Sequence, residues 1–435
     1  MNPLYEQMKT SVFERMSNLA VQRGAVNLGQ GFPDFGWPEE ILDAAAAALK
    51  DGSNQYPPSR GLPALREAVA AHYNRHQGLA LTADNVCITS GATEALGAAI
   101  LATVQQGDEV VLLTPAYDSY APMVRSAGAI VREVALRPPS WRIDPLTLEE
   151  AIGPKTRAII FNNPHNPAGR MFAREELETL ARIACEHDLI LISDEVWEHV
   201  VLNDQPFVPF SSLPGMAERT IKVGSAGKIF SLTGWKVGWM IGSPELASVV
   251  ARAHLFINFS TPPNLQSAVA FGLEVGEPWI AAMRPRFTRA RDRLVTGLRD
   301  AGFDVIGGEA TYFVCVDLAA SGIGMDDESF ALAAVERAGV AVIPLSAFAA
   351  DDPPRHLVRL CFAKRTRRLT RVSPRWRARR SYWHERCRRS RRNPESIRRP
   401  IRRQLDQPLA DRRERDGASD TWKSGCRMFP GSRGI

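Results

Sequence analysis

Short apolar runs alternate with amphipathic segments between about residues 40 and 245. The apolar runs are rich in Val, Ile and Leu: VCITS (86–90), EVVLLTP (109–115), AIIFNNP (158–164), LILISDE (189–195) and TIKVGS (220–225). Runs of this kind are typical of strands that are buried on both faces of a parallel sheet. The segments between them include PALREAVAAHYNRH and REELETLARIACEH, with apolar residues three and four apart, as in helices. The pattern predicts an α/β domain with a mostly parallel sheet sandwiched by helices.

The pattern changes after about residue 270. PRFTRARDRLVTGLRDAG predicts a long charged helix, and TYFVCVDL, VAVIPL and HLVRLCFA predict strands. We therefore expect a large domain over residues 31–270 and a smaller α+β domain with an antiparallel sheet over residues 271–364. Residues 1–30 have little apolar surface of their own, so we expect them to form an arm that packs on the small domain or on a partner subunit.

Polar residues stand where the predicted strands end. Asn162, Asp194 and Ser225 occupy such positions, and ligands of parallel sheets bind at the carboxyl ends of the strands. Lys228 follows one strand in a Gly/Ser-rich loop. An isolated lysine is usually a solvent-exposed charge, but a partly desolvated one has a lowered pKa and attacks carbonyl groups, as Schiff-base chemistry requires. Ser225 and Lys236 add a hydroxyl and a second cation that suit a phosphate.

The segment SAGKIFSLTGWKVGW (225–239) resembles the pyridoxal-phosphate lysine segment of the fold-type-I aminotransferases of classes I and II. Within that family it is most similar to the kynurenine aminotransferase and glutamine transaminase K group and to bacterial methionine aminotransferases. The likeness extends from about residue 10 to Lys364. Further motifs that carry it are NLGQGFPDF (27–35), NQYPP (54–58), SGATEAL (90–96), PAYDSY (115–120), NNPHNPAG (162–169), SDEVWEH (193–199), TYFV (311–314), IPLSAF (343–348) and LVRLCFAK (357–364).

The resemblance implies the fold-type-I transferase fold, with a seven-stranded type of sheet in the large domain, and pyridoxal 5′-phosphate as cofactor. Lys228 would form the internal aldimine and shuttle the proton between the substrate Cα and the cofactor. Asp194 would pair with the pyridine nitrogen, because a buried carboxylate needs a cation. The other cofactor-binding residues would be Gly91, Ala92, Thr93, Tyr117, Asn166, Trp197, Ser225, Lys236 and, from the second subunit of a homodimer with shared active sites, Tyr56.

Substrate binding would use Gly31, Asn162, Asn166 and Arg359. Arg359 would hold the substrate α-carboxylate with a bidentate fork, whereas its alternative is a strand-edge arginine. The amide of Asn166 would donate to the cofactor's phenolic oxygen, and the backbone N–H groups of residues 91–93 would hold the phosphate at a helix N-terminus.

Trp197 departs from the family pattern, because relatives usually carry a tyrosine whose hydroxyl bonds the phenolic oxygen. Either the indole N–H takes over this bond or Asn166 makes it alone, and we favour Asn166. A third interpretation is that Trp197 only walls the pocket. We expect a higher aldimine pKa than in a Trp197→Tyr variant.

The function implied is a ping-pong aminotransferase that moves an amino group from one amino acid to a 2-oxo acid. The aromatic pocket candidates Phe32, Phe35, Tyr117 and Phe348 favour apolar, aromatic or sulfur-containing L-amino acids. One alternative is a cysteine-S-conjugate β-lyase. The other is an inactive body whose basic tail binds nucleic acid.

The cysteine content indicates the cellular compartment. The six cysteines show no C-x-x-C spacing, which indicates reduced thiols and a cytoplasmic enzyme. We expect no membrane segment and no metal site. His72 and His76 stand four apart on a predicted helix without a metal-binding motif, so we expect them on an exposed face.

The charge is concentrated at the end of the chain. Residues 365–435 contain 22 Arg and 1 Lys against 7 acidic residues, a net charge of +16, while the preceding residues carry −10. The stretch has no apolar period, and its arginine bias is typical of GC-rich codons read out of frame. We expect a frameshifted, disordered tail in place of the family's C-terminal helix. The alternative is a basic nucleic-acid arm, which we do not favour, so we expect no nucleic-acid partner.

Overall fold

The central sheet follows the predicted pattern. The computed structural model describes residues 1–8, 10–379 and 382–383. Within these residues the largest sheet has seven strands in the order β2-β8-β7-β6-β5-β3-β4, and β8 alone among them runs antiparallel to its neighbours. The strands are β2 (Val86–Thr89), β3 (Glu109–Thr114), β4 (Ile130–Ala135), β5 (Thr156–Asn162), β6 (Ile190–Asp194), β7 (Thr220–Ser225) and β8 (Gly238–Ile241). The mostly parallel sheet is confirmed.

Two strands of this sheet were missed from the sequence. β4 is an edge strand, and exposed and partly buried residues alternate over its first four positions, unlike the apolar runs of the inner strands. β8 has four residues and begins with glycine inside the SAGKIFSLTGWKVGW segment. Neither has the long apolar run that marks the central strands.

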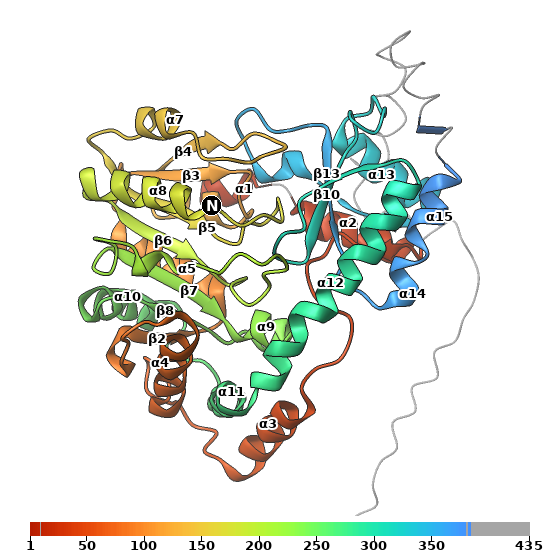
Figure 1. Cartoon of the computed structure of the whole chain (residues 1–435). Coiled ribbons are helices and arrows are strands. Elements are labelled where there is room, and N and C mark those ends of the chain that lie inside the picture. Colours follow the sequence, from red (N-terminus) through yellow and green to blue (C-terminus); the bar gives the residue numbers. More distant parts are fainter. Residues whose placement is uncertain (9, 380–381, 384–435) are drawn as a thin grey trace, which may run out of the picture. The chain divides into compact units, whose positions relative to one another are not determined.

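Helices cover both faces of the sheet (Figure 1). α5 packs against β6, β7 and β8, and α4 packs against β2 and α11. The helices of this part are α3 (Glu39–Asp51), α4 (Pro63–Gln77), α5 (Ala92–Thr103), α6 (Tyr120–Ser126), α7 (Pro145–Glu150), α8 (Arg174–Glu186), α9 (Ala226–Ile229), α10 (Pro244–Ile257) and α11 (Pro263–Val275).

A second, antiparallel sheet has the order β12-β13-β10-β9. Its strands are β9 (Asp304–Ile306), β10 (Phe313–Asp317), β12 (Ile343–Pro344) and β13 (Leu357–Cys361), and its helices are α12 (Glu277–Asp300) and α13 (Asp327–Ala338). The N-terminal arm joins this part, because β1 (Val26–Asn27) pairs with β11 (Val340–Ala341) and α2 (Val12–Gln22) contacts α13. It begins with α1 (Pro3–Glu6). The exact division into four segments stays a prediction.

The expected disorder after Lys364 is wrong for residues 365–379. They form α14 (Thr366–Leu369) and α15 (Val372–Arg377), which pack against α12. Leu369, Val372 and Trp376 are buried, and the Trp376 ring lies 4.8 Å from that of Phe303. Their spacing of three and four residues provides the apolar face that the arginine-rich composition obscured. The rest of the tail lies outside the described residues, and the frameshift stays a prediction.

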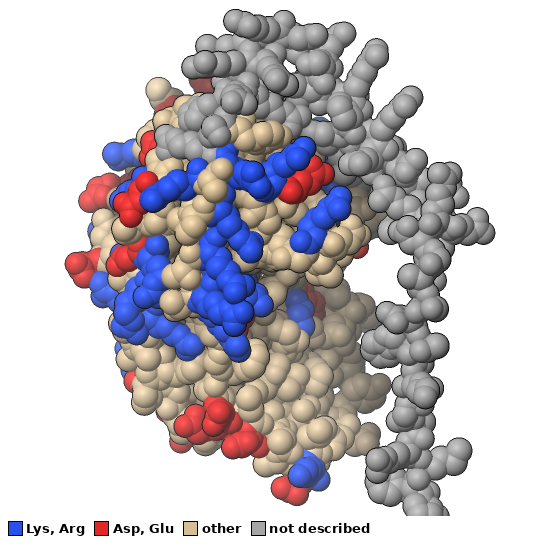
Figure 2. Space-filling model, turned by 90° about the vertical axis from the view of Figure 1, so that its right-hand side faces the viewer, with Lys and Arg blue, Asp and Glu red and all other residues tan. Residues whose placement is uncertain are grey.

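Figure 2 shows Lys and Arg side chains gathered on the face that carries α12, α14 and α15. Exposed arginines in the segments that form these helices include Arg284, Arg289, Arg293, Arg367, Arg371 and Arg377. Part of the arginine-rich C-terminal segment thus lies on helices that pack against the small domain.

Four cysteines lie among the described residues, and all four are free thiols: Cys87, Cys185, Cys315 and Cys361. No helix in the described part of the chain is long and apolar enough to cross a membrane.

Candidate active site

A cavity of about 470 Å³ opens at the carboxyl ends of β5, β6 and β7. Its walls come from the N-terminal arm, the central sheet and the small-domain strands β10 and β13. It brings together every predicted site residue except Tyr56: Gly31, Gly91, Ala92, Thr93, Tyr117, Asn162, Asn166, Asp194, Trp197, Ser225, Lys228, Lys236 and Arg359. Its size is typical of sites for small ligands.

Asp194 ends β6 and is buried. Its Oδ2 accepts a hydrogen bond from the Tyr120 hydroxyl at 2.6 Å, and its Oδ1 accepts one from the backbone N–H of Val196 at 3.3 Å. Burial raises the pKa of Asp194, although both bonds and the charge of Lys228 oppose the shift. A carboxylate in this position is suited to face a cationic ligand group.

Lys228 lies on the short helix α9, which follows β7. Its Nζ is 3.4 Å from the Tyr312 hydroxyl oxygen and 4.6 Å from the centre of the Trp197 ring. Burial lowers the pKa of Lys228 to about 8. At neutral pH this change raises the neutral, nucleophilic fraction of the amine from about 0.03% to about 9%. The amine is therefore prepared to attack a carbonyl carbon.

Asn162, Asn166 and Arg359 form a chain of hydrogen bonds from the sheet to the small domain. Asn162 donates through Nδ2 to the backbone oxygen of Asp194 at 2.8 Å, and its Oδ1 accepts the backbone N–H of Asn166 at 2.7 Å. Asn166 Oδ1 in turn accepts from Arg359 at 2.6 Å. The oxygen of Asn166 is thus occupied, which orients its NH₂ group as the donor.

Arg359 is 1% exposed, on β13. One terminal nitrogen binds Asn166, the other donates to the Gly29 carbonyl at 2.9 Å, and Nε has no partner among the described residues. Burial lowers the pKa of Arg359 to about 10, so it stays charged at neutral pH. Its guanidinium lies 3.9 Å from the centre of the Phe313 ring and about 5 Å from those of Phe13 and Phe348. A buried cation with unused donors is suited to a carboxylate.

The part of the cavity around Gly91 and Lys236 fits a phosphate. Gly91 precedes α5 with a φ of +80°, and an added Cβ there would lie 3.1 Å from Lys236 Nζ. Lys236 itself has a positive φ of 55°. The first turn of α5, with Thr93, and Ser225 line the same end. The free N–H groups at the N-terminus of α5 and the ammonium group of Lys236 beside Gly91 form an anion site.

Tyr56 does not reach this cavity. It is 83% exposed, and its ring packs on Phe259 at 5.2 Å. Of the aromatic pocket candidates, Phe32 and Tyr117 line the cavity, and Phe348 lines a neighbouring smaller one with Tyr117. Phe35 packs instead against Phe287.

Several contributors to the cavity were missed as individual residues. Tyr120 and Asp118 lie within the PAYDSY motif, and Tyr312 and Phe313 lie within TYFV, so the motifs carried the signal without a role for each side chain. Ser11 and Phe13 come from the N-terminal arm, where no motif indicated a site. Further cavity-lining residues include Ser11, Phe13, Asp118, Tyr120 and Phe313, and the Tyr312 hydroxyl contacts Lys228.

Comparison with known proteins agrees with this geometry. The sequence model of aminotransferase class I and II matches residues 23–372. The chain belongs to the class I and II aminotransferases.

Two relatives and one solved structure illustrate the likeness. The methionine aminotransferase of Escherichia coli is 38% identical over 86% of this chain and 99% of its own length. The kynurenine–oxoglutarate transaminase of Dictyostelium discoideum is 36% identical over 81% and 90%. The structure of N-succinyldiaminopimelate aminotransferase from Mycobacterium tuberculosis superposes with a TM-score of 0.84 at 42% identity and covers 87% of this chain and 99% of that chain. The fold-type-I expectation is confirmed.

This aminotransferase uses pyridoxal 5′-phosphate, the cofactor of its family. The residues present fit that group on observations of this chain alone. Lys228 offers a buried amine of lowered pKa, Asp194 offers a buried acid, and Gly91 leaves room where a side chain would meet Lys236. As an aminotransferase, it acts on amino acids and 2-oxo acids.

Proposed function

We propose that this aminotransferase moves the amino group of an apolar, aromatic or sulfur-containing L-amino acid to a 2-oxo acid in a ping-pong cycle. The observation that carries the substrate class is the aromatic surround of Arg359. A carboxylate bound to Arg359 would bring the substrate side chain near the rings of Phe13 and Phe313, which favours an apolar or aromatic side chain. Relatives named for methionine and kynurenine support the same class.

When bound, pyridoxal phosphate supplies an aldehyde for amines and a protonated ring that withdraws electrons. Asp194 Oδ1 and Oδ2 would hold the proton on the ring nitrogen. Asn166 would donate its NH₂ group to the phenolic oxygen, because its own oxygen is taken by Arg359. Lys228 Nζ would carry the proton to and from the substrate Cα, and its pKa of about 8 lets it both accept and release a proton near neutral pH.

We also propose a homodimer with shared active sites. Tyr56, Phe256 and Phe259 are large apolar residues that are 83%, 87% and 43% exposed. Exposed aromatic residues in one region are typical of an interface. Tyr56 would complete the phosphate site of the second subunit. The cytoplasmic location indicated by the cysteines stays a prediction.

The test uses the full-length chain supplied with pyridoxal phosphate. We expect absorbance at about 420 nm and transfer from methionine, phenylalanine and kynurenine to 2-oxoglutarate, both lost in Lys228→Ala. A colourless, inactive wild-type protein would contradict the reaction. A clear preference for N-succinyl-diaminopimelate would contradict only the substrate class, and pyruvate release from a cysteine S-conjugate without an oxo acid would identify a β-lyase instead.

A further inference from the structure

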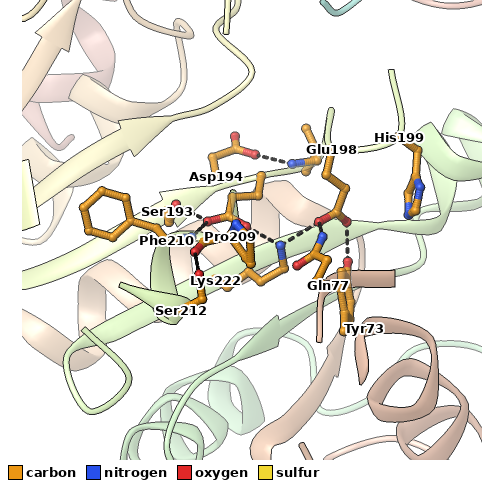
Figure 3. A network of polar contacts seen from close by, with 12 residues as sticks. Tyr73, Gln77, Ser193, Asp194, Glu198, His199, Pro209, Phe210, Ser212 and Lys222 are labelled. Atoms are coloured by element: carbon orange, nitrogen blue, oxygen red, sulfur yellow. Dashed lines mark hydrogen bonds and ion pairs between the residues drawn. The ribbon is translucent and has the colours of Figure 1, made fainter. Parts of the chain in front are cut away.

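A buried ion triad lies behind the turn that carries Asp194 and Trp197 (Figure 3). Lys222, inside β7, places its Nζ between the carboxylates of Glu195 and Glu198, at 2.6 Å from Glu198 Oε2. All three side chains are 1% exposed. The charges of Glu195 and Glu198 raise the pKa of Lys222, although burial opposes them.

Neutral donors complete the triad. Glu195 accepts hydrogen bonds from the Ser193 hydroxyl at 2.8 Å and from the backbone N–H of Phe210 at 3.0 Å. Glu198 accepts from the Tyr73 hydroxyl at 2.5 Å and from Gln77 at 2.6 Å. Figure 3 shows Lys222, Gln77 and Tyr73 converging on Glu198. One ammonium and two carboxylates leave one excess negative charge, and these donors stabilise it.

Two histidines lie beside the triad without adding charge. His72 and His199 share a contact of 2.8 Å between their Nε2 atoms. Burial lowers the pKa of His72 to about 2 and that of His199 to about 3, so both are neutral at neutral pH. The expectation of an exposed face is wrong for His72, because this side of α4 packs towards the triad.

The side chains of the turn are divided between the cavity and the triad. Asp194 and Trp197 line the cavity, whereas Glu195 and Glu198 point to Lys222. Glu198 N–H also bonds the Glu195 carbonyl at 3.1 Å, which closes the turn. Since successive residues of a strand face opposite sides, Lys222 lies behind the sheet surface that presents Val223. Because Glu195 directly follows Asp194 and Glu198 directly follows Trp197, the triad restrains the backbone that carries both cavity residues.

The same network contacts the strand that leads to Lys228. Trp239 donates to the Tyr73 hydroxyl at 3.0 Å. A Cβ on Gly224 would lie 2.1 Å from Trp239 Nε1 and 2.5 Å from the Tyr73 hydroxyl, so both side chains touch the β7 backbone directly before Ser225. The turn that carries Asp194 and the end of β7 before Lys228 thus contact the same buried polar network.

We propose that Lys222, Glu195 and Glu198 are positioning residues of the transamination site, which fix the Asp194 carboxylate and the Trp197 ring relative to Lys228. The inference rests on the proposed roles of Asp194 and Lys228. Displacement of catalytic groups by about 1 Å costs on the order of a hundredfold in rate. A triad that cannot rearrange without leaving a buried charge unpaired is suited to prevent such displacement.

The main variant is Glu198→Gln. It leaves Lys222 and Glu195 as a balanced pair, so no unpaired charge is buried. A triple variant, Lys222→Met/Glu195→Gln/Glu198→Gln, removes all charges at nearly constant volume. The control is Glu109→Gln, because Glu109 is also a buried, ion-paired carboxylate but lies at the start of β3, at the end of the sheet away from the cavity. The readouts are the melting temperature, the Kd for pyridoxal phosphate and the pH midpoint of the visible absorbance.

We expect Glu198→Gln, and any folded triple variant, to weaken cofactor binding about tenfold, by analogy with outer-shell partners of bound groups, and to shift the pH midpoint. Glu109→Gln should lower the melting temperature and change neither. A folded Glu198→Gln or triple variant with unchanged Kd and midpoint would show that the triad only stabilises the fold. Failure of the wild-type protein itself to bind the cofactor would refute the proposed function instead.

Discussion

The contact between Trp197 and Lys228 predicts that the Trp197 ring influences the pKa of Lys228. The Nζ of Lys228 lies 4.6 Å from the centre of the Trp197 ring, within the range of a cation–π contact. Such a contact stabilises the ammonium form by about 0.5–2 kcal/mol. At about 1.36 kcal/mol per pKa unit, a contact of this strength would raise the pKa of Lys228 by about 0.4–1.5.

The perturbation is Trp197→Phe, with Trp197→Tyr beside it. A phenyl ring attracts a cation less than an indole does, so we expect the pKa of Lys228 to fall below its value of about 8. Only the neutral amine attacks the cofactor aldehyde. The pKa therefore appears as the midpoint in a plot of the cofactor uptake rate of the apoprotein against pH. Trp197→Phe should lower this midpoint by about 0.3–1 unit.

The phenol ring of Trp197→Tyr also attracts a cation less than an indole does, so this variant should lower the midpoint as well. The visible absorbance of the loaded protein should titrate at a higher pH in the wild type than in Trp197→Tyr. Trp376→Phe is the control, because Trp376 packs on Phe303 and Phe330 in the small domain. If Trp197→Phe and the wild type share one midpoint, the indole does not set the proton affinity of Lys228, and it only walls the cavity.

Two further predictions concern single buried groups. Arg359→Lys keeps the charge but loses the fork that binds Asn166 and Gly29; we expect kcat/KM to fall about a hundredfold or more, measured by steady-state kinetics, while the visible absorbance stays. Burial raises the pKa of Asp327 to about 6, against 3.8 in the unfolded chain. The stability that the protonated Asp327 gives to the fold is therefore complete below pH 3.8. It is lost as the pH rises through about 6. In the wild type, the unfolding free energy should fall by about 3 kcal/mol over this pH range. In Asp327→Asn this decrease should be absent, as measured by urea denaturation at several pH values. An equal dependence on pH in both proteins would contradict the prediction.

The sequence was most informative where burial imposes a single pattern. Strands β3, β5, β6 and β7 are buried along nearly all of their residues and appeared as apolar runs. β4 stayed hidden because its first four residues alternate between exposed and partly buried positions and include Arg132 and Glu133. The two helices after Lys364 stayed hidden because arginines outnumber the few apolar residues that hold them.

The site was predictable at the strand ends and through motifs, but the contacts between the side chains were not. That Asn166 would accept from Arg359, and Asp194 from Tyr120, depends on segments far apart in the sequence. Spacing within a motif cannot show which of two polar ends of an amide faces a ligand. Those contacts follow only when the domains are assembled.

Lys222 shows how a sequence can indicate a buried network that motifs miss. It interrupts the run TIKVGS, in which the flanking residues are apolar and the strand is buried throughout. A lysine in such a strand cannot reach solvent, so it requires an acid from a neighbouring strand or turn. β6 is that neighbour, and the only acids near its end are Asp194, Glu195 and Glu198 in the described chain. Because Asp194 faces the cavity, the two glutamates are the partners left for Lys222. A lysine in the middle of an apolar strand can therefore indicate the buried ion pairs that hold the residues of a neighbouring active site.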